Sequence, residues 1–227
     1  MARYFNGTSD YIKIADNAAL SLPDGGFTLA GWFKPYTLAS ATRYFFSHGT
    51  VTAQSSCNLY YGEAGFSVTS SLVSDGNTTK TGYGITGSLA SNAWRHICLR
   101  CAGDSLSVFM NGVQNIAANA NAWNGINPAG DLYLGGRNDL AADRFFKGWM
   151  AEWAKWDSAL TNAQIELLAV GELPSQIGTA SAWYMPLNLD TVEKIGGLTV
   201  TVNGTTWAEH PEQIIRLQRS RQLTLGV

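Results

Sequence analysis

Short segments with alternating side chains dominate this sequence, and paired turn residues separate them. The turn pairs are Asp75-Gly76, Asn111-Gly112, Asn124-Gly125 and Asn203-Gly204. Such pairs favour tight hairpins, because both residues tolerate the positive φ angles that these turns need. The segments alternate apolar and polar residues, as strands with one buried face do. They cover residues 11–15, 27–33, 94–101, 105–110, 131–136, 148–156 and 198–202. This spacing predicts an all-β fold built as an antiparallel β-sandwich.

The composition agrees with a single β-rich domain. A sandwich often reaches 227 residues as one unit, and 45% hydrophobic residues supply a full core. The formal net charge is −2, so we expect no nucleic-acid partner. No apolar run is long enough to span a membrane. Residues 1–14 lack the features of a secretion signal, so we expect none.

One short helix is predicted near residues 161–170. Thr161 is placed as its N-cap, and Gln164 follows three residues later, which is a capping box. Gly171 lies just beyond the predicted end, and Pro174 prevents continuation. A single helix of this length leaves the all-β class unchanged.

The cysteines are predicted to be structural. Cys98 and Cys101 have the spacing of a metal or redox motif, but they lie in the alternating run 94–101. Residues three apart on a strand point to opposite faces, so their sulfur atoms would not converge on one ion. With Cys57 the chain has three cysteines, which is too few for a disulfide framework.

The last sixteen residues differ from the rest. We divide the chain into a sandwich domain, residues 1–211, and residues 212–227, which form either a closing strand or an arm that reaches another chain. Apolar and polar residues alternate in this segment, which favours a strand. The predicted docking residues are Ile215, Arg216, Leu217, Arg219, Arg221, Leu223 and Leu225. The arginines suit an acidic partner surface.

The order of several motifs resembles a known family. The motifs are FNGTSDYIKI, FTLAGWFKP, WRHICLRCAGDSLSVFMNGV, DLYLGGR and FKGWMAEWAKWDSALTNAQI, followed by SAWYMPLNLD and LTVTVNGTTW. Together they are similar to laminin-G-like and pentraxin-like domains of the concanavalin A-like lectin/glucanase superfamily, over roughly residues 3–172. The resemblance implies a concanavalin A-like jelly roll, with Trp32 and Trp94 at core positions. It implies a fold more than an activity, because one fold hosts many functions.

Calcium is the one cofactor that the resemblance raises. Asp10 matches an acidic position of the first motif. Relatives commonly carry a possible ligand Asp where this chain has Ala151, and a hard cation needs six or more oxygen ligands. Calcium is therefore doubtful, and Asp10 has the alternative role of capping the turn at residues 7–9. We expect no other cofactor.

Glycoside hydrolysis is a weak hypothesis for this chain. It requires two carboxylates about 5–9 Å apart, according to mechanism. No predicted strand carries acidic residues at positions i and i+2. The run 148–156 holds a single carboxylate, Glu152, which regular alternation places on the same face as Met150 and Ala154.

Ligand-binding candidates lie in the predicted loops. Aromatic residues there are platforms for sugars or anchors for protein contacts, although packing under long loops is the alternative. These aromatic candidates are Tyr60, Tyr61, Tyr83 and Trp123. The charged loop 137–146 adds Arg137, Asp139 and Asp143, for which local ion pairs are the competing interpretation.

Three functional hypotheses follow. The first is a non-enzymatic interaction protein, a decoration or accessory component of a phage virion, which docks on a larger assembly and contacts glycans or a host surface. It would be made in the host cytoplasm and act as a homo-oligomer or on an oligomeric shell. The second is a free carbohydrate-binding lectin module, extracellular or cytoplasmic, and the third is a glucan hydrolase. Other virion proteins and glycans are thus the expected partners.

Overall fold

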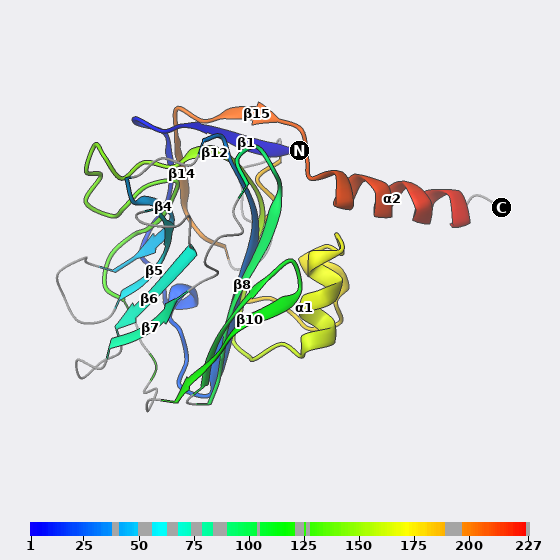
Figure 1. Cartoon of the computed structure of the whole chain (residues 1–227), viewed down its shortest axis with the longest axis horizontal. Coiled ribbons are helices and arrows are strands. Elements are labelled where there is room, and N and C mark those ends of the chain that lie inside the picture. Colours follow the sequence, from blue (N-terminus) through cyan, green and yellow to red (C-terminus); the bar gives the residue numbers. More distant parts are fainter. Residues whose placement is uncertain are drawn as a thin grey trace.

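Two antiparallel sheets face each other in this protein (Figure 1). The computed structural model describes residues 1–37, 41–49, 56–62, 68–73, 79–83, 90–103, 105–120, 125, 128–188 and 197–225. Sheet A contains, in spatial order, β10 (Val113–Ala120), β9 (Ser105–Met110), β8 (Arg95–Ala102), β3 (Gly26–Pro35), β12 (Lys147–Trp156), β1 (Ala2–Asn6) and β15 (Thr206–Ala208), and β13 (Trp183–Met185) also pairs with β12. Sheet B contains β14 (Val200–Asn203), β2 (Tyr11–Ile14), β11 (Leu132–Leu134), β4 (Arg43–His48), β5 (Ser56–Tyr61), β6 (Val68–Val73) and β7 (Thr79–Tyr83). The predicted all-β sandwich is confirmed.

An aromatic core fills the space between the sheets. Phe33 of sheet A stacks on Phe45 of sheet B with ring centroids 4.8 Å apart. Trp153 packs against Phe46 at 5.8 Å, and its indole lies directly over Gly31. A Cβ at Gly31 would lie 2.4 Å from that ring, so a residue without a side chain is required there.

The outer face of sheet A carries a second apolar layer. Helix α1 (Asn162–Ala169) covers it through Ile165 and Leu168, and Thr161 forms the predicted capping box with Gln164. The 3₁₀ turns Ala18–Leu20 and Pro174–Gln176 are the other short helical elements of the described chain. The predicted helix is therefore confirmed.

The prediction that Cys98 and Cys101 point to opposite faces of their strand is also confirmed. Cys98 belongs to the cluster under α1, whereas Cys101 belongs to the core between the sheets. All three cysteines are buried, and none of them forms a disulfide in the described chain. Burial raises the pKa of Cys57 and Cys98, which keeps these thiols protonated and unreactive.

Each alternating run forms all or part of a strand in the structure, namely β2, β3, β8, β9, β11, β12 and β14. Asn111 and Gly112 both have positive φ, 50° and 82°, as the predicted hairpin turn requires. Gly204 also has a positive φ of 75° between β14 and β15. Residues 75–76 and 124 lie outside the described residues.

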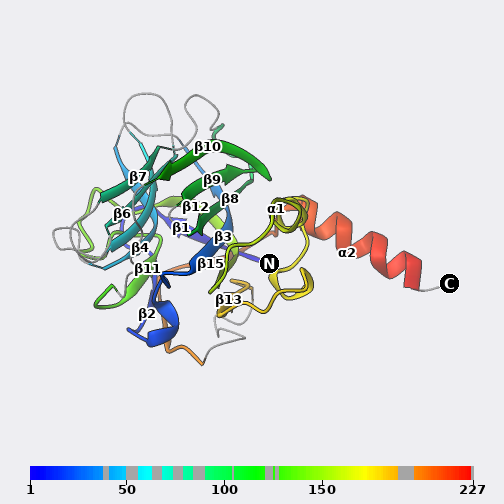
Figure 2. The same ribbon diagram turned by 90° about the horizontal axis from the view of Figure 1, so that it is seen from below.

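The strand prediction for the C-terminal segment is wrong. Residues Glu212–Leu225 form helix α2, which begins directly after Pro211 and projects away from the sandwich (Figures 1 and 2). Glu212 pairs with Arg216 one turn later at 2.9 Å, an arrangement that stabilises helices. The segment is also rich in Gln, Leu and Arg, which are strong helix formers. No helix in the described part of the chain has the length and apolarity of a membrane span.

We expect Gly31→Ala to destabilise the fold by about 1–3 kcal/mol, because the added methyl group would displace Trp153 from a packed core. Urea unfolding followed by tryptophan fluorescence measures the effect. Gly25→Ala is the matched control, since a Cβ at Gly25 meets nothing within 4 Å. Equal unfolding midpoints for the two variants would contradict this account of the core.

Candidate functional site

A grid of aromatic and lysine side chains occupies the outer face of sheet A. In one row, Lys34 of β3 lies opposite Trp149 of β12, which lies opposite Tyr4 of β1. In the next row, the Tyr36 N–H donates to the Lys147 carbonyl at 3.0 Å. We call these five residues the aromatic–lysine strip. Its rings are in contact, since the Trp149 centroid is 5.2 Å from that of Tyr4 and 5.8 Å from that of Tyr36.

The alternation of β12 explains why these side chains face outward. Met150 points into the core between the sheets, so its neighbour Trp149 points to the other face. Gly148 between the two outward residues has φ +148°, and a Cβ there would lie 2.2 Å from the Lys34 carbonyl oxygen. Glycine therefore lets β12 approach β3 at this point and sets the positions of Lys147 and Trp149.

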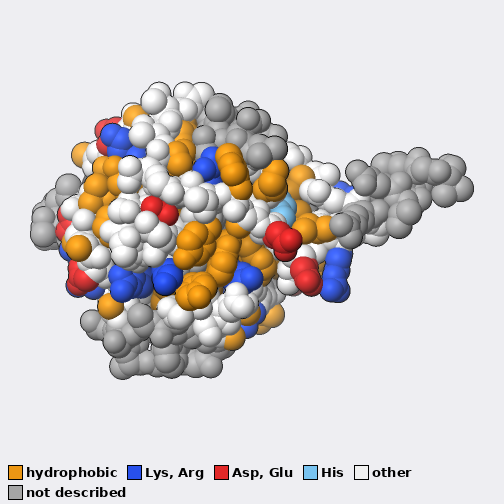
Figure 3. All heavy atoms as spheres, turned by 90° about the horizontal axis from the view of Figure 1, so that it is seen from above, with side chains coloured by type: hydrophobic (Ala, Val, Ile, Leu, Met, Phe, Trp, Pro, Cys, Tyr) orange, Lys and Arg blue, Asp and Glu red, His pale blue; other side chains and the backbone are white. Residues whose placement is uncertain are grey.

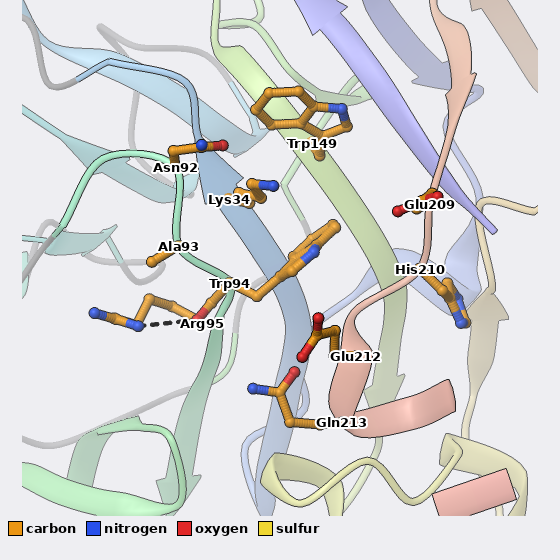
Figure 4. A pocket seen from close by; sticks show the side chains of 10 residues that line it. All are labelled: Lys34, Asn92, Ala93, Trp94, Arg95, Trp149, Glu209, His210, Glu212 and Gln213. Atoms are coloured by element: carbon orange, nitrogen blue, oxygen red, sulfur yellow. Dashed lines mark hydrogen bonds between the residues drawn. The ribbon is translucent and has the colours of Figure 1, made fainter. Parts of the chain in front are cut away.

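A pocket of about 520 Å³ opens at the end of the strip (Figure 4). Figure 4 shows Lys34 between Trp94 and Trp149, with Glu209 and Glu212 on the side of α2. The wall also contains Asn92, Ala93, Arg95, His210 and Gln213. The Arg95 guanidinium donates to the Trp94 carbonyl at 3.0 Å and is directed away from the two indoles. Two indoles thus flank a polar hollow that is open to solvent.

Glu152 lies at a break in the alternation of β12. The pairing with β3 shifts register between Ala151 and Ala154, and Glu152 has a positive φ of 54°. Because of this bulge, Met150 lies between the sheets while Ala154 packs under α1. The prediction that both share a face with Glu152 is therefore wrong.

The carboxylate of Glu152 is buried and holds two partners. The Tyr184 hydroxyl donates to Oε2, and His210 Nε2 lies 2.7 Å from Oε1. Burial, followed by the charge of Glu152 and the hydrogen bond to it, raises the pKa of Tyr184 far above its usual value. These three residues line a cavity of about 280 Å³ beside Met1 and Gln218. His210 is the second residue before α2, so the cluster anchors the root of that helix.

Three predicted site residues gather on sheet B. Tyr60 stacks on Tyr44 with centroids 4.9 Å apart, and the Arg137 guanidinium lies 5.8 Å from the Tyr44 ring. Arg137 donates to both carboxylate oxygens of Asp139, at 2.8 and 2.6 Å. This guanidinium interaction lowers the pKa of Asp139. Local ion pairs therefore hold the charged loop, as the competing interpretation states.

The other predicted residues do not join this group. Tyr61 points into the core and is 1% exposed, and its hydroxyl donates to the Thr37 carbonyl, so its prediction as a ligand residue is wrong. The Asp143 carboxylate pairs with its neighbour Arg144 at 3.5 Å. Trp123 and the side chain of Tyr83 lie outside the described residues.

The doubtful calcium ligand Asp10 has a structural role in its turn. Asp10 is buried, and its Oδ2 accepts from the Asn6 N–H at 2.9 Å, so the carboxylate closes the turn at residues 7–9. Ala151 lies in an apolar cluster with Trp32 and Ile214. Within the described residues, no group of three or more His, Cys, Asp or Glu is arranged to hold a metal. One carboxylate that already caps a turn falls short of the oxygen ligands that calcium needs.

The main site residues were not identified from the sequence. Trp149 belongs to the alternating run 148–156, which predicts only a strand, and Lys147 directly precedes that run. Lys34 directly follows the run 27–33. The resemblance places Trp94 in the core; in the structure it is half-buried, packs against the cluster around Trp32 and also lines the pocket. The available signal was the shared parity of Lys147, Trp149 and Ala151, which identifies one face of the strand.

Two facing antiparallel sheets with this strand order define a jelly-roll type of β-sandwich. The Laminin G 3 family profile, described as the concanavalin A-like lectin/glucanases superfamily, matches residues 6–166. The chain belongs to this family. The human neuronal pentraxin receptor is 37% identical over 120 residues, which are 49% of this chain and 23% of the receptor. The chain therefore spans less than a quarter of that relative's length.

Solved structures show the same fold at low sequence identity. A candidate carbohydrate-binding protein from Bacteroides ovatus has a TM-score of 0.68 at 20% identity, over 90% of this chain and 58% of that one. Domain 4 of the extracellular GH43 arabinanase AbnA from Geobacillus stearothermophilus, solved in complex with arabinotriose, has a TM-score of 0.53 at 22% identity. That match covers 74% of this chain and 76% of the domain.

We expect Tyr184→Phe to lower the free energy of unfolding by about 1–3 kcal/mol, because it removes a hydrogen bond from a buried carboxylate. Chemical denaturation measures the change. Tyr133→Phe, at a half-exposed tyrosine of sheet B, is the control and should be nearly neutral. If both variants unfold at the wild-type midpoint, the Glu152 cluster does not stabilise the root of α2.

Proposed function

We propose that this protein is a non-catalytic carbohydrate-binding protein whose site is the Trp94–Trp149 pocket. The observation that carries the proposal is the pair of half-buried indoles around a polar hollow of about 520 Å³. The C–H face of a sugar ring packs on an indole, while its hydroxyl groups need hydrogen-bond partners. Asn92, Gln213 and Glu209 supply amide and carboxylate groups at the rim.

The comparisons support a sugar ligand. The Bacteroides ovatus protein carries a candidate carbohydrate-binding description, and the arabinanase domain holds arabinotriose. Both share the fold with this chain, and the pocket supplies the chemistry that such ligands require. The glycan partner expected from the sequence is therefore retained, now at a different place on the molecule.

The absence of catalysis is part of the proposal. Glu209 and Glu212 line the pocket, but both are exposed. A carboxylic acid that donates a proton near neutral pH is normally adapted by burial. Glu152 is buried, yet its Oε2 accepts from the Tyr184 hydroxyl and its Oε1 lies 2.7 Å from His210 Nε2, beside a second cavity.

Helix α2 favours a second function, which is docking on a larger assembly such as a phage particle. Its first turn is fixed by the buried Ile214, and Arg221 further along pairs with Glu172 of the body, while the helix as a whole extends outward (Figure 1). Arg216 pairs only within the helix, with Glu212, and its exposed guanidinium suits an acidic partner surface. A virion component of this kind would present the sugar pocket outward from a shell to which α2 is attached.

Replacement of Trp149 tests the sugar site. We expect Trp149→Ala to weaken glycan binding by about tenfold or more, because the stacking surface is lost. A glycan array identifies ligands, and calorimetry on a hit gives the affinity. Trp207→Ala is the control, since Trp207 is 45% exposed and lies outside the pocket lining. Full affinity in Trp149→Ala, or no glycan ligand at all, would refute the proposed function.

Truncation of α2 tests the docking role. Deletion of residues 218–227 keeps Ile214 over the sandwich but removes the ion pair between Arg221 and Glu172, so we expect the protein to fold with a thermal midpoint lowered by about 2–4 °C. Association with the isolated assembly should be lost, because the projecting part of the helix is gone. Co-sedimentation with particles measures occupancy. Full occupancy by the truncated protein would exclude α2 as the anchor.

A further inference from the structure

We propose that the aromatic–lysine strip makes the pocket specific for acidic glycans, whose carboxylate or sulfate groups bind Lys34 and Lys147. This inference rests on the proposed function and names the class of sugar. The strip continues from the pocket, because Lys34 and Trp149 belong to both. A chain of sugars stacked on Trp149 would therefore pass over the second lysine.

Both lysines lie over aromatic rings. The Lys34 Nζ is 4.6 Å from the centroid of Trp149, and the Lys147 Nζ is 4.6 Å from that of Tyr36. Each cation is thus held beside a surface on which a sugar ring can stack. An acidic sugar has an apolar ring face and an anionic substituent. The strip is complementary to it, because aromatic rings and cations alternate across two strands.

Neither lysine forms an ion pair with any described residue. Lysines elsewhere do so, since Lys13 pairs with Asp131 at 3.2 Å and the buried Lys155 pairs with Asp157. Arginine side chains in the charged loop also have carboxylate partners. Lys34 and Lys147 are half-buried cations whose charge is left for a ligand.

The acidic side chains of the pocket wall are Glu209 and Glu212. Both lie on the α2 side of the pocket, across from Lys34 (Figure 4). Figure 3 shows hydrophobic side chains in the middle of this face, with acidic side chains beside the root of α2 and others on the far side of the face. Repulsion from Glu209 and Glu212 directs an acidic chain toward Lys147, away from α2.

The test compares three polymers: polygalacturonate for carboxylates, dextran sulfate for sulfates and neutral dextran. We expect binding to at least one acidic polymer to exceed binding to dextran by tenfold or more and to weaken with added NaCl. Lys34→Gln with Lys147→Gln should reduce acidic-polymer binding about tenfold. Lys13→Gln, on sheet B, is the matched control and should bind as the wild type does.

The outcomes separate the two proposals. Equal affinity for neutral and acidic polymers, lost in Trp149→Ala, would overturn acidic specificity and keep the carbohydrate site. Acidic binding that survives the double lysine variant would also overturn this inference. Equally tight binding of single-stranded DNA would show that the strip recognises anions in general rather than glycans. Which of the two acidic polymers binds identifies the anionic group.

Discussion

Strand β12 pairs with β3 on one side and with β1 on the other, and this central position links the core to the site. Its inward residues, Met150 and Trp153, fill the space between the sheets. Trp149 lies on the opposite face and forms the wall of the pocket. A change in the register of β12 would therefore move the core and the binding surface together, since alternate residues serve opposite faces.

The fold was predictable from the sequence because its strongest signals are local. Alternation specified seven strands, the Asn111-Gly112 pair specified a hairpin, and Thr161 with Gln164 specified the start of α1. The strand prediction for residues 212–225 was wrong for a physical reason. In a short segment, apolar residues can fit both the two-residue period of a strand and the 3.6-residue period of a helix. Whether a sheet edge pairs with the segment depends on the rest of the fold, which local sequence does not reveal.

The site was less predictable because it depends on pairing between distant segments. Lys34 and Trp149 become neighbours only through the register of β3 with β12, more than one hundred residues apart. Tyr60 and Tyr61 show the opposite error, since adjacent strand residues face opposite sides and only one of them reaches the outer surface. The bulge at Glu152 is equally invisible in the sequence, because it breaks the parity from which faces are assigned.

The same outer face of sheet A is divided between helix and ligand. Ile214 of α2 covers Trp32 and Ala151, and the row of Lys34, Trp149 and Tyr4 begins where that cover ends. The connection into α2 also supplies Glu209 to the pocket wall. Because the helix root is both a cover for apolar side chains and a border of the pocket, a force that bends α2 would also change the shape of the pocket. The proposed docking helix and the proposed sugar site therefore share residues 209–214.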